Sequence, residues 1–104
     1  MTMQELSKKS AEELEELALI MAERGNMRAL GLINEVREYA HKRVVVVKGR
    51  KVPVGTEGEV FWMGSRDYSK YGDPWGIYTY VRVGIRTDSG DVHWTDVNNI
   101  KVIE

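Results

Sequence analysis

Hydrophobic positions recur at helical spacing in the first 43 residues. After Ser10, apolar side chains follow one another three or four positions apart, at Leu14, Leu17, Ala18 and Met21. This spacing predicts an amphipathic helix over residues 11–24. Ser10 stands three residues before Glu13, which predicts a capping box at the start of the helix. Gly25 predicts its end directly after Arg24.

A second helix is predicted from residue 27 to about residue 43, with Asn26 as its N-cap. Its apolar positions are Leu30, Ile33, Val36 and Ala40. The connection is so short that the two helices should form an antiparallel hairpin. Further apolar residues lie on other sides of the hairpin, at Leu19, Ile20 and Leu32. The hairpin must therefore bury surface, either against the rest of the chain or against another molecule.

From Val44 onward the period changes to two, which is typical of β-strands. Five strands are predicted at about residues 43–48, 58–63, 77–87, 91–95 and 100–103. In the second strand, strict alternation groups Val60, Trp62 and Gly64 on one face and places Phe61 and Met63 on the other. Residues 88–91 predict a turn, and residues 96–99 predict a single helical turn before the last strand.

The third strand shows its two faces most clearly. The apolar set, which we expect to face the core, consists of Ile77, Thr79, Val81, Val83, Ile85 and Thr87. Aromatic and cationic residues from several strands should point outward or lie at the rim of the sheet: Trp62, Tyr78, Tyr80, Arg82, Arg86 and Trp94. They could line a groove, or the helical hairpin could cover them.

A glycine-rich first loop joins the first two strands. The segment Val45-x-Val47-x-Gly49 … Gly55-x-x-Gly58-x-Val60 resembles the KOW motif of ribosomal proteins and transcription-elongation factors. The five short strands and the tight turn before the last one likewise resemble an SH3-like barrel. The resemblance implies a five-stranded SH3-like β-barrel at residues 44–104. Together with the helical hairpin predicted at residues 1–43, the expected fold class is α+β.

The same resemblance implies that cations of the first loop meet RNA or DNA phosphates. These cations are Lys48, Arg50 and Lys51. The loop departs from the motif at Val52-Pro53-Val54, where KOW loops are often more basic. The alternative is a solvated hairpin tip with no partner.

Residues 64–76 form a predicted loop that is long for a small barrel, and long loops are often functional. It interleaves cations with aromatic rings, which stack on bases or on proline rings. The candidate binding residues are Arg66, Tyr68, Lys70, Tyr71 and Trp75. The alternative is that Tyr71 and Trp75 fold back and cover an open end of the barrel.

Composition narrows the function classes. The chain has 104 residues, a net charge of −1 and no cysteine, so it offers no thiol nucleophile or thiolate metal site. His41 and His93 lack spaced metal-ligating partners, and we expect His41 to complement the dipole at a helix C-terminus. We therefore predict no enzyme activity and no cofactor. No segment predicts a membrane span or a signal peptide, so a cytoplasmic protein is expected.

The predicted function is a small non-catalytic binding module. Its partner would be nucleic acid or a nucleic-acid-binding protein. The alternative is a protein-interaction or inhibitor module that docks on a larger protein, because Trp, Tyr and Arg also dominate protein interfaces. A third hypothesis is a homodimer formed through the helical hairpin.

Overall fold

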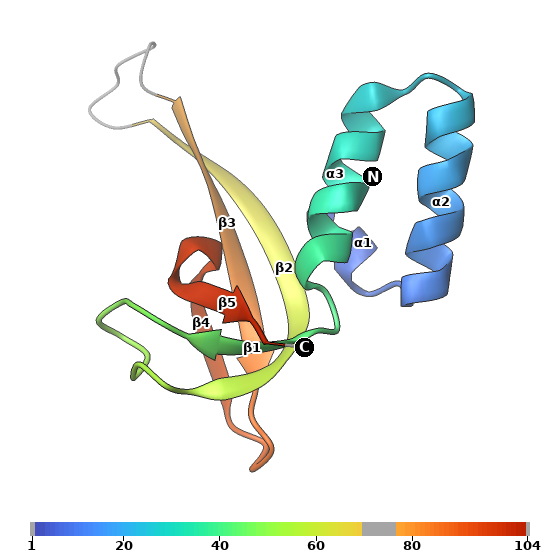
Figure 1. Cartoon of the computed structure of the whole chain (residues 1–104). Coiled ribbons are helices and arrows are strands. Elements are labelled where there is room, and N and C mark those ends of the chain that lie inside the picture. The colour runs from blue at the N-terminus through green and yellow to red at the C-terminus, as the bar shows by residue number, and fades with distance from the viewer. Residues whose placement is uncertain (1, 70–76, 104) are drawn as a thin grey trace.

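The computed structural model describes the backbone of residues 2–69 and 77–103 and the side chains of residues 2–65 and 80–103. Three helices precede a sheet: α1 (Met3–Ser7), α2 (Ala11–Glu23) and α3 (Met27–Tyr39) (Figure 1). The predicted capping box of α2 is confirmed, because Ser10 Oγ accepts from the Glu13 amide and the Glu13 side chain accepts from the Ser10 amide. The predicted N-cap of α3 is confirmed as well, since Asn26 Oδ1 accepts from the amide of Ala29.

Helix α1 was not predicted, because a five-residue helix is too short to show an apolar period. It begins where Thr2 Oγ1 accepts from the Glu5 amide at 3.2 Å. Helix α3 ends at Tyr39, earlier than expected, so His41 lies just past the C-cap residue Ala40. His41 adopts a φ of 64°, and its Nε2 donates to the carbonyl oxygen of Lys9 at 2.7 Å. This bond ties the α1–α2 connection to the start of the sheet.

The five predicted strands are present as β1 (Arg43–Val46), β2 (Glu57–Ser69), β3 (Ile77–Arg86), β4 (Val92–Asp96) and β5 (Ile100–Val102). The predicted helical turn is the 3₁₀ helix η2 (Val97–Asn99). The strands form one antiparallel sheet in the order β4-β3-β2-β1-β5. Because β4 and β5 occupy opposite edges, the sheet is not closed into the expected barrel.

Strand β2 is much longer than predicted. It pairs with β3 as far as Ser69↔Ile77, so residues 64–69 of the predicted loop are strand. The backbone pairing continues through mostly polar residues of β2, which lie opposite aromatic and β-branched residues of β3.

A β-bulge near Phe61 overturns the strict alternation predicted for β2. Val60 pairs with Ile85, but the next paired residue is Trp62, opposite Gly84. A bulge places two residues opposite one, which reverses the faces beyond it. Val60 and Met63 are therefore both fully buried, whereas Phe61 and Trp62 are half-buried on the other face. The predicted grouping of Trp62 with Val60 is wrong for this reason.

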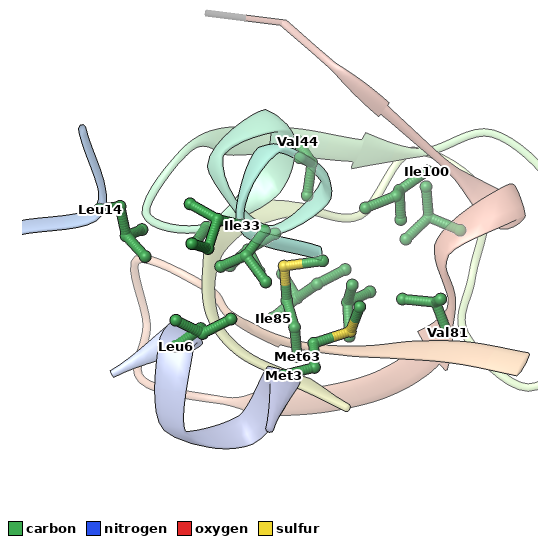
Figure 2. Packing of buried hydrophobic residues seen from close by; sticks show 14 of the residues in the cluster. Met3, Leu6, Leu14, Ile33, Val44, Met63, Val81, Ile85 and Ile100 are labelled. Atoms are coloured by element: carbon green, nitrogen blue, oxygen red, sulfur yellow. The ribbon is translucent and has the colours of Figure 1, made fainter. Parts of the chain in front are cut away.

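The helices dock on the sheet and share one core with it (Figure 2). Met3 and Leu6 of α1 belong to the same buried cluster as Met63 of β2, and α1 packs against both β2 and α3. Ser7 is buried and its hydroxyl lies 3.5 Å from the Met63 carbonyl oxygen. Ile33 and Val36 of α3 are fully buried in this core and Leu32 packs against it, whereas Leu19 of α2 stays 63% exposed.

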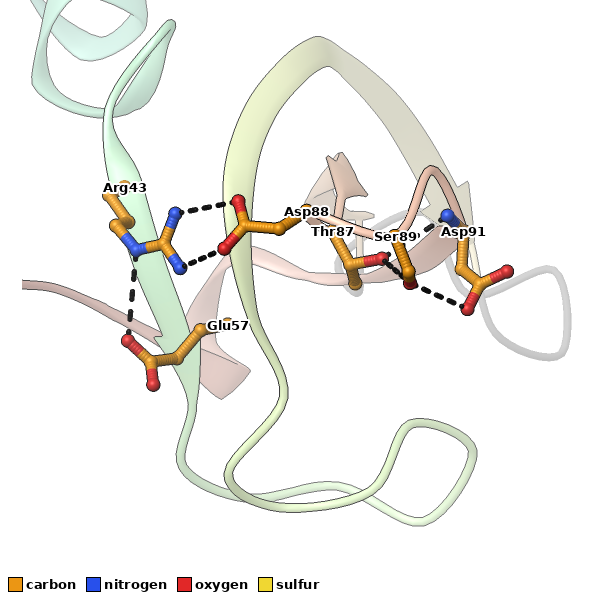
Figure 3. A network of polar contacts seen from close by, with 6 residues as sticks. All are labelled: Arg43, Glu57, Thr87, Asp88, Ser89 and Asp91. Atoms are coloured by element: carbon orange, nitrogen blue, oxygen red, sulfur yellow. Dashed lines mark hydrogen bonds and ion pairs between the residues drawn. The ribbon is translucent and has the colours of Figure 1, made fainter.

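A polar network fixes the β3–β4 turn (Figure 3). The Arg43 guanidinium donates to both carboxylate oxygens of Asp88, at 3.1 and 3.0 Å, and also pairs with Glu57 at 3.8 Å. Within the turn, Ser89 Oγ donates to Asp91 Oδ2 at 3.1 Å. The Arg43 hydrogen bonds lower the pKa of Asp88 below its ordinary value of 3.8. The turn thereby links β1 to the hairpin that carries β4.

Candidate functional site

An aromatic cluster covers the face of the sheet opposite the core. Trp94 of β4 makes edge-to-face contacts with Phe61, at a centroid distance of 5.6 Å, and with Trp62, at 5.2 Å. The guanidinium carbon of Arg86 lies 4.5 Å from the centre of the Phe61 ring, a cation–π contact. The bulge in β2 makes this cluster, because it presents two successive aromatic residues to one side.

Two glycines leave room for these rings. Gly84 pairs with Trp94 across β3 and β4, and a Cβ at Gly84 would lie 2.7 Å from the Trp94 ring and 2.9 Å from the Phe61 ring. A Cβ at Gly64 would overlap the ring of Trp62. The two indoles therefore pack closely over bare backbone, and Trp94 stays 44% exposed.

A hollow of about 430 Å³ opens beside this cluster. Its aromatic wall is made by Tyr80 and Trp94, each 44% exposed. Three cations lie around it, Arg82 from β3 with Arg50 and Lys51 from the β1–β2 loop. Among the described residues, Thr95, Asp96 and Asn99 add a polar wall.

The β1–β2 loop is held against η2, which brings its cations to the hollow. Val47 donates its amide to the carbonyl of Asn99 at 2.8 Å. Gly49 has a φ of 117°, and a Cβ there would lie 2.9 Å from Asn99 Nδ2, so the close approach depends on glycine. Val52 is buried in the core and anchors the far side of the loop.

A second hollow of about 300 Å³ adjoins the first. It is lined by Gln4 of α1, Trp62, Gly64 and Ser65 of β2, and again by Arg82 and Trp94. Arg82 and Trp94 thus stand between the two hollows and belong to both. We call the surface made by the aromatic cluster and the two hollows the aromatic–cationic face.

Only some of the predicted site residues lie at the hollows. Arg50 and Lys51 lie at the first hollow, and Lys48 is exposed on the same loop outside its lining. Arg66 and Tyr68 lie in β2 and pair with Tyr80 and Tyr78 of β3. The remaining predicted residues, Lys70, Tyr71 and Trp75, lie outside the described residues.

The residues that strand alternation predicted to point outward identify the first hollow better than the predicted long loop does. Tyr80, Arg82 and Trp94 line the first hollow, and the helices do not cover them. The polar wall was missed at Thr95, Asp96 and Asn99, because only the packing of the loop on η2 brings these residues beside the cations. Phe61 was missed because no local signal marked the bulge.

Across residues 2–69 and 77–103, no group of three or more His, Cys, Asp or Glu side chains is arranged to hold a metal ion. None of the helices in these residues is long and apolar enough to span a membrane. No family model, curated protein or solved structure matches this chain. The chemistry of the aromatic–cationic face is therefore the basis for assigning a function.

Proposed function

We propose that this protein is a non-catalytic binding module for single-stranded nucleic acid, which it takes on the aromatic–cationic face. The observation that carries the proposal is that Arg82 and Trp94 line two adjoining hollows. A single strand repeats a base and a phosphate along its length. Two neighbouring hollows with a shared ring and a shared guanidinium suit two successive nucleotides, through stacking and charge pairing.

The exposed rings favour a single strand over a duplex. In a duplex the base faces are stacked inside, whereas an unpaired strand offers each face to an aromatic side chain. Trp94 and Tyr80 present ring surface at the protein exterior, and Trp94 packs over the bare backbone of Gly84.

The positive charge of this face is local, since the chain as a whole carries a net charge of −1. Arg50, Lys51 and Arg82 gather at the first hollow, where Asp96 supplies the one carboxylate among the described lining residues. Acidic residues concentrate on α2, which lies on the far side of α3 from the sheet (Figure 1). A phosphate chain is therefore attracted to one face.

We also propose that the sheet is an SH3-like barrel left open between β4 and β5. The strand order supports this, since β1 pairs with both β2 and β5. The 3₁₀ turn that leads from β4 into β5 supports it as well.

The first experiment measures binding of fluorescently labelled single-stranded RNA and DNA oligonucleotides by anisotropy. We expect binding that weakens with salt, with a slope of roughly 0.7 in log affinity against log salt for each phosphate contacted. Absence of binding to either strand at about 50 mM salt would overturn the proposal. In that case, a protein from a cell lysate that stays bound to the immobilised chain after nuclease treatment would favour the protein-interaction alternative.

Variants test whether the face is responsible. Arg82→Ala should weaken binding and lower the salt slope by about 0.7, the contribution of one phosphate contact. Arg24→Ala removes the same charge at the C-cap of α2 and should leave the slope unchanged. Tyr80→Ala should cost about 1–3 kcal/mol of binding through lost stacking. Equal effects of Arg82→Ala and Arg24→Ala would show that the contact lies elsewhere.

A further inference from the structure

We infer that the first hollow selects a guanine base, an inference that rests on the proposed function. The hollow combines three kinds of group that a nucleotide needs. Tyr80 and Trp94 offer stacking surface, Arg50 and Arg82 offer positive charge for a phosphate, and Asp96 offers a carboxylate on the polar wall. Its volume of about 430 Å³ falls within the ~300–1,000 Å³ typical of small-ligand sites.

The carboxylate of Asp96 is held in place by the backbone amide of Asn98. Its Oδ1 accepts from the amide of Asn98 at 2.8 Å, which caps η2. Among the described residues no partner engages its second oxygen, Oδ2. Asn99, the next polar residue of the wall, already donates to Thr95 Oγ1 at 3.0 Å. The polar wall therefore presents mainly a fixed acceptor to an incoming base.

An ionised carboxylate can only accept hydrogen bonds, so it selects a base with donors. Guanine places a ring N–H beside an amino group on one edge, and both can point at one carboxylate. Adenine and cytosine set an amino group beside a bare ring nitrogen, whose lone pair repels the carboxylate. Uracil and thymine offer one N–H between two carbonyl oxygens. Guanine is therefore the base whose edge best complements Asp96.

The cations lie where they can bind the phosphate of the same nucleotide. Arg50 and Lys51 come from the loop on one side of the hollow, and Arg82 stands on the boundary with the second hollow. A base on the Asp96 wall leaves its phosphate near these side chains. The neighbouring nucleotide then lies over Trp62 in the second hollow, so the guanine is read within a strand.

The test compares labelled oligouridine strands that carry one central guanine, inosine or adenine with plain oligouridine. Inosine keeps the ring N–H of guanine but lacks its amino group. We expect the guanine strand to bind at least about 5-fold more tightly than the others, the lower end of discrimination by a bidentate contact. Free GMP should compete weakly, because it leaves the second hollow empty.

Asp96→Asn is the matched variant, because asparagine caps a helix as well as aspartate does. It replaces one acceptor oxygen with a donor, so the preference for guanine should vanish. Binding of plain oligouridine should persist or strengthen, since a negative charge is lost. Asp91→Asn removes the same charge in the β3–β4 turn and should keep the preference.

The outcomes separate the two proposals. Equal binding of all strands by the native protein overturns the guanine inference and leaves the proposed function standing. Absence of binding to any strand overturns both. A guanine preference that survives Asp96→Asn, or that is equally strong for inosine, refutes the role of Asp96. GMP binding as tight as strand binding would refute the reading of guanine within a strand.

Discussion

Gly84→Ala is the most direct test of how the aromatic–cationic face is built. The new Cβ would lie 2.7 Å from the Trp94 ring and 2.9 Å from the Phe61 ring, whereas ordinary contacts begin at 3.4 Å. Both rings must therefore retreat by roughly half an ångström or more, away from the distances at which dispersion contacts are favourable. Their edge-to-face contact, worth about 0.5–1.5 kcal/mol, weakens as they part.

We expect Gly84→Ala to lower the free energy of unfolding by about 1–2 kcal/mol, within the range for overpacking. For a domain of this size, each 1 kcal/mol corresponds to about 4–8 °C in Tm. Urea unfolding followed by tryptophan fluorescence and by far-UV circular dichroism measures the change. The fluorescence of the native state should change too, because Trp94 moves.

Gly31→Ala is the matched control. Gly31 lies exposed on α3, and a Cβ there would meet nothing within 4 Å. The same added methyl group should stabilise the chain by about 0.5–1 kcal/mol, because alanine is a better helix former. If Gly84→Ala matched the stability and native fluorescence of the unsubstituted chain, the close packing of Trp94 and Phe61 over Gly84 would be refuted.

Three further substitutions test the rest of the fold by urea unfolding. Met63→Ala should lower the free energy of unfolding by about 2–5 kcal/mol, because Met63 is fully buried where α1 meets the sheet. Met27 is 68% exposed, so Met27→Ala should change the free energy of unfolding by less than about 0.5 kcal/mol. Similar losses for both variants would contradict this core. Ser10→Ala should lower the free energy of unfolding by about 1 kcal/mol, because it removes the N-cap of α2. An unchanged free energy of unfolding would mean that the capping box contributes nothing. Asp88→Asn should destabilise the chain at about pH 6, because the hydrogen bonds from Arg43 lower the pKa of Asp88 in the folded state. A lowered folded pKa stabilises the chain above the ordinary value of 3.8, and this contribution is lost as the pH falls through the folded pKa. The difference between the two proteins should therefore vanish by about pH 2, and a difference that persisted there would refute its electrostatic origin.

Local features were predicted well because their causes are local. The cap at Ser10 and the cap at Asn26 depend on residues three positions away. The inward set of β3 follows from alternation alone, and Val83 and Ile85 are fully buried as predicted. The 3₁₀ turn before β5 was also predicted, from side chains that hydrogen-bond to nearby backbone amides.

The predictions that were wrong concern how distant parts meet. Strict alternation failed at Phe61, since a bulge arises from the pairing of two strands and leaves no clear mark on one of them. The length of β2 was underestimated because Gly64 and the polar residues after it are typical of a loop. Helix α1 is too short to show a period, and it is stabilised by packing on β2 and α3.

The sequence by itself therefore determined the helices and their caps, the five strands and the outward direction of Tyr80, Arg82 and Trp94, because these depend on spacing along the chain. The tertiary structure alone decided that the sheet stays open and that the helices cover its inner face. It also decided that Arg50, Lys51 and Asp96 surround one hollow. Arg50 and Lys51 lie more than forty residues before Asp96, and the contact between the first loop and η2 brings them together.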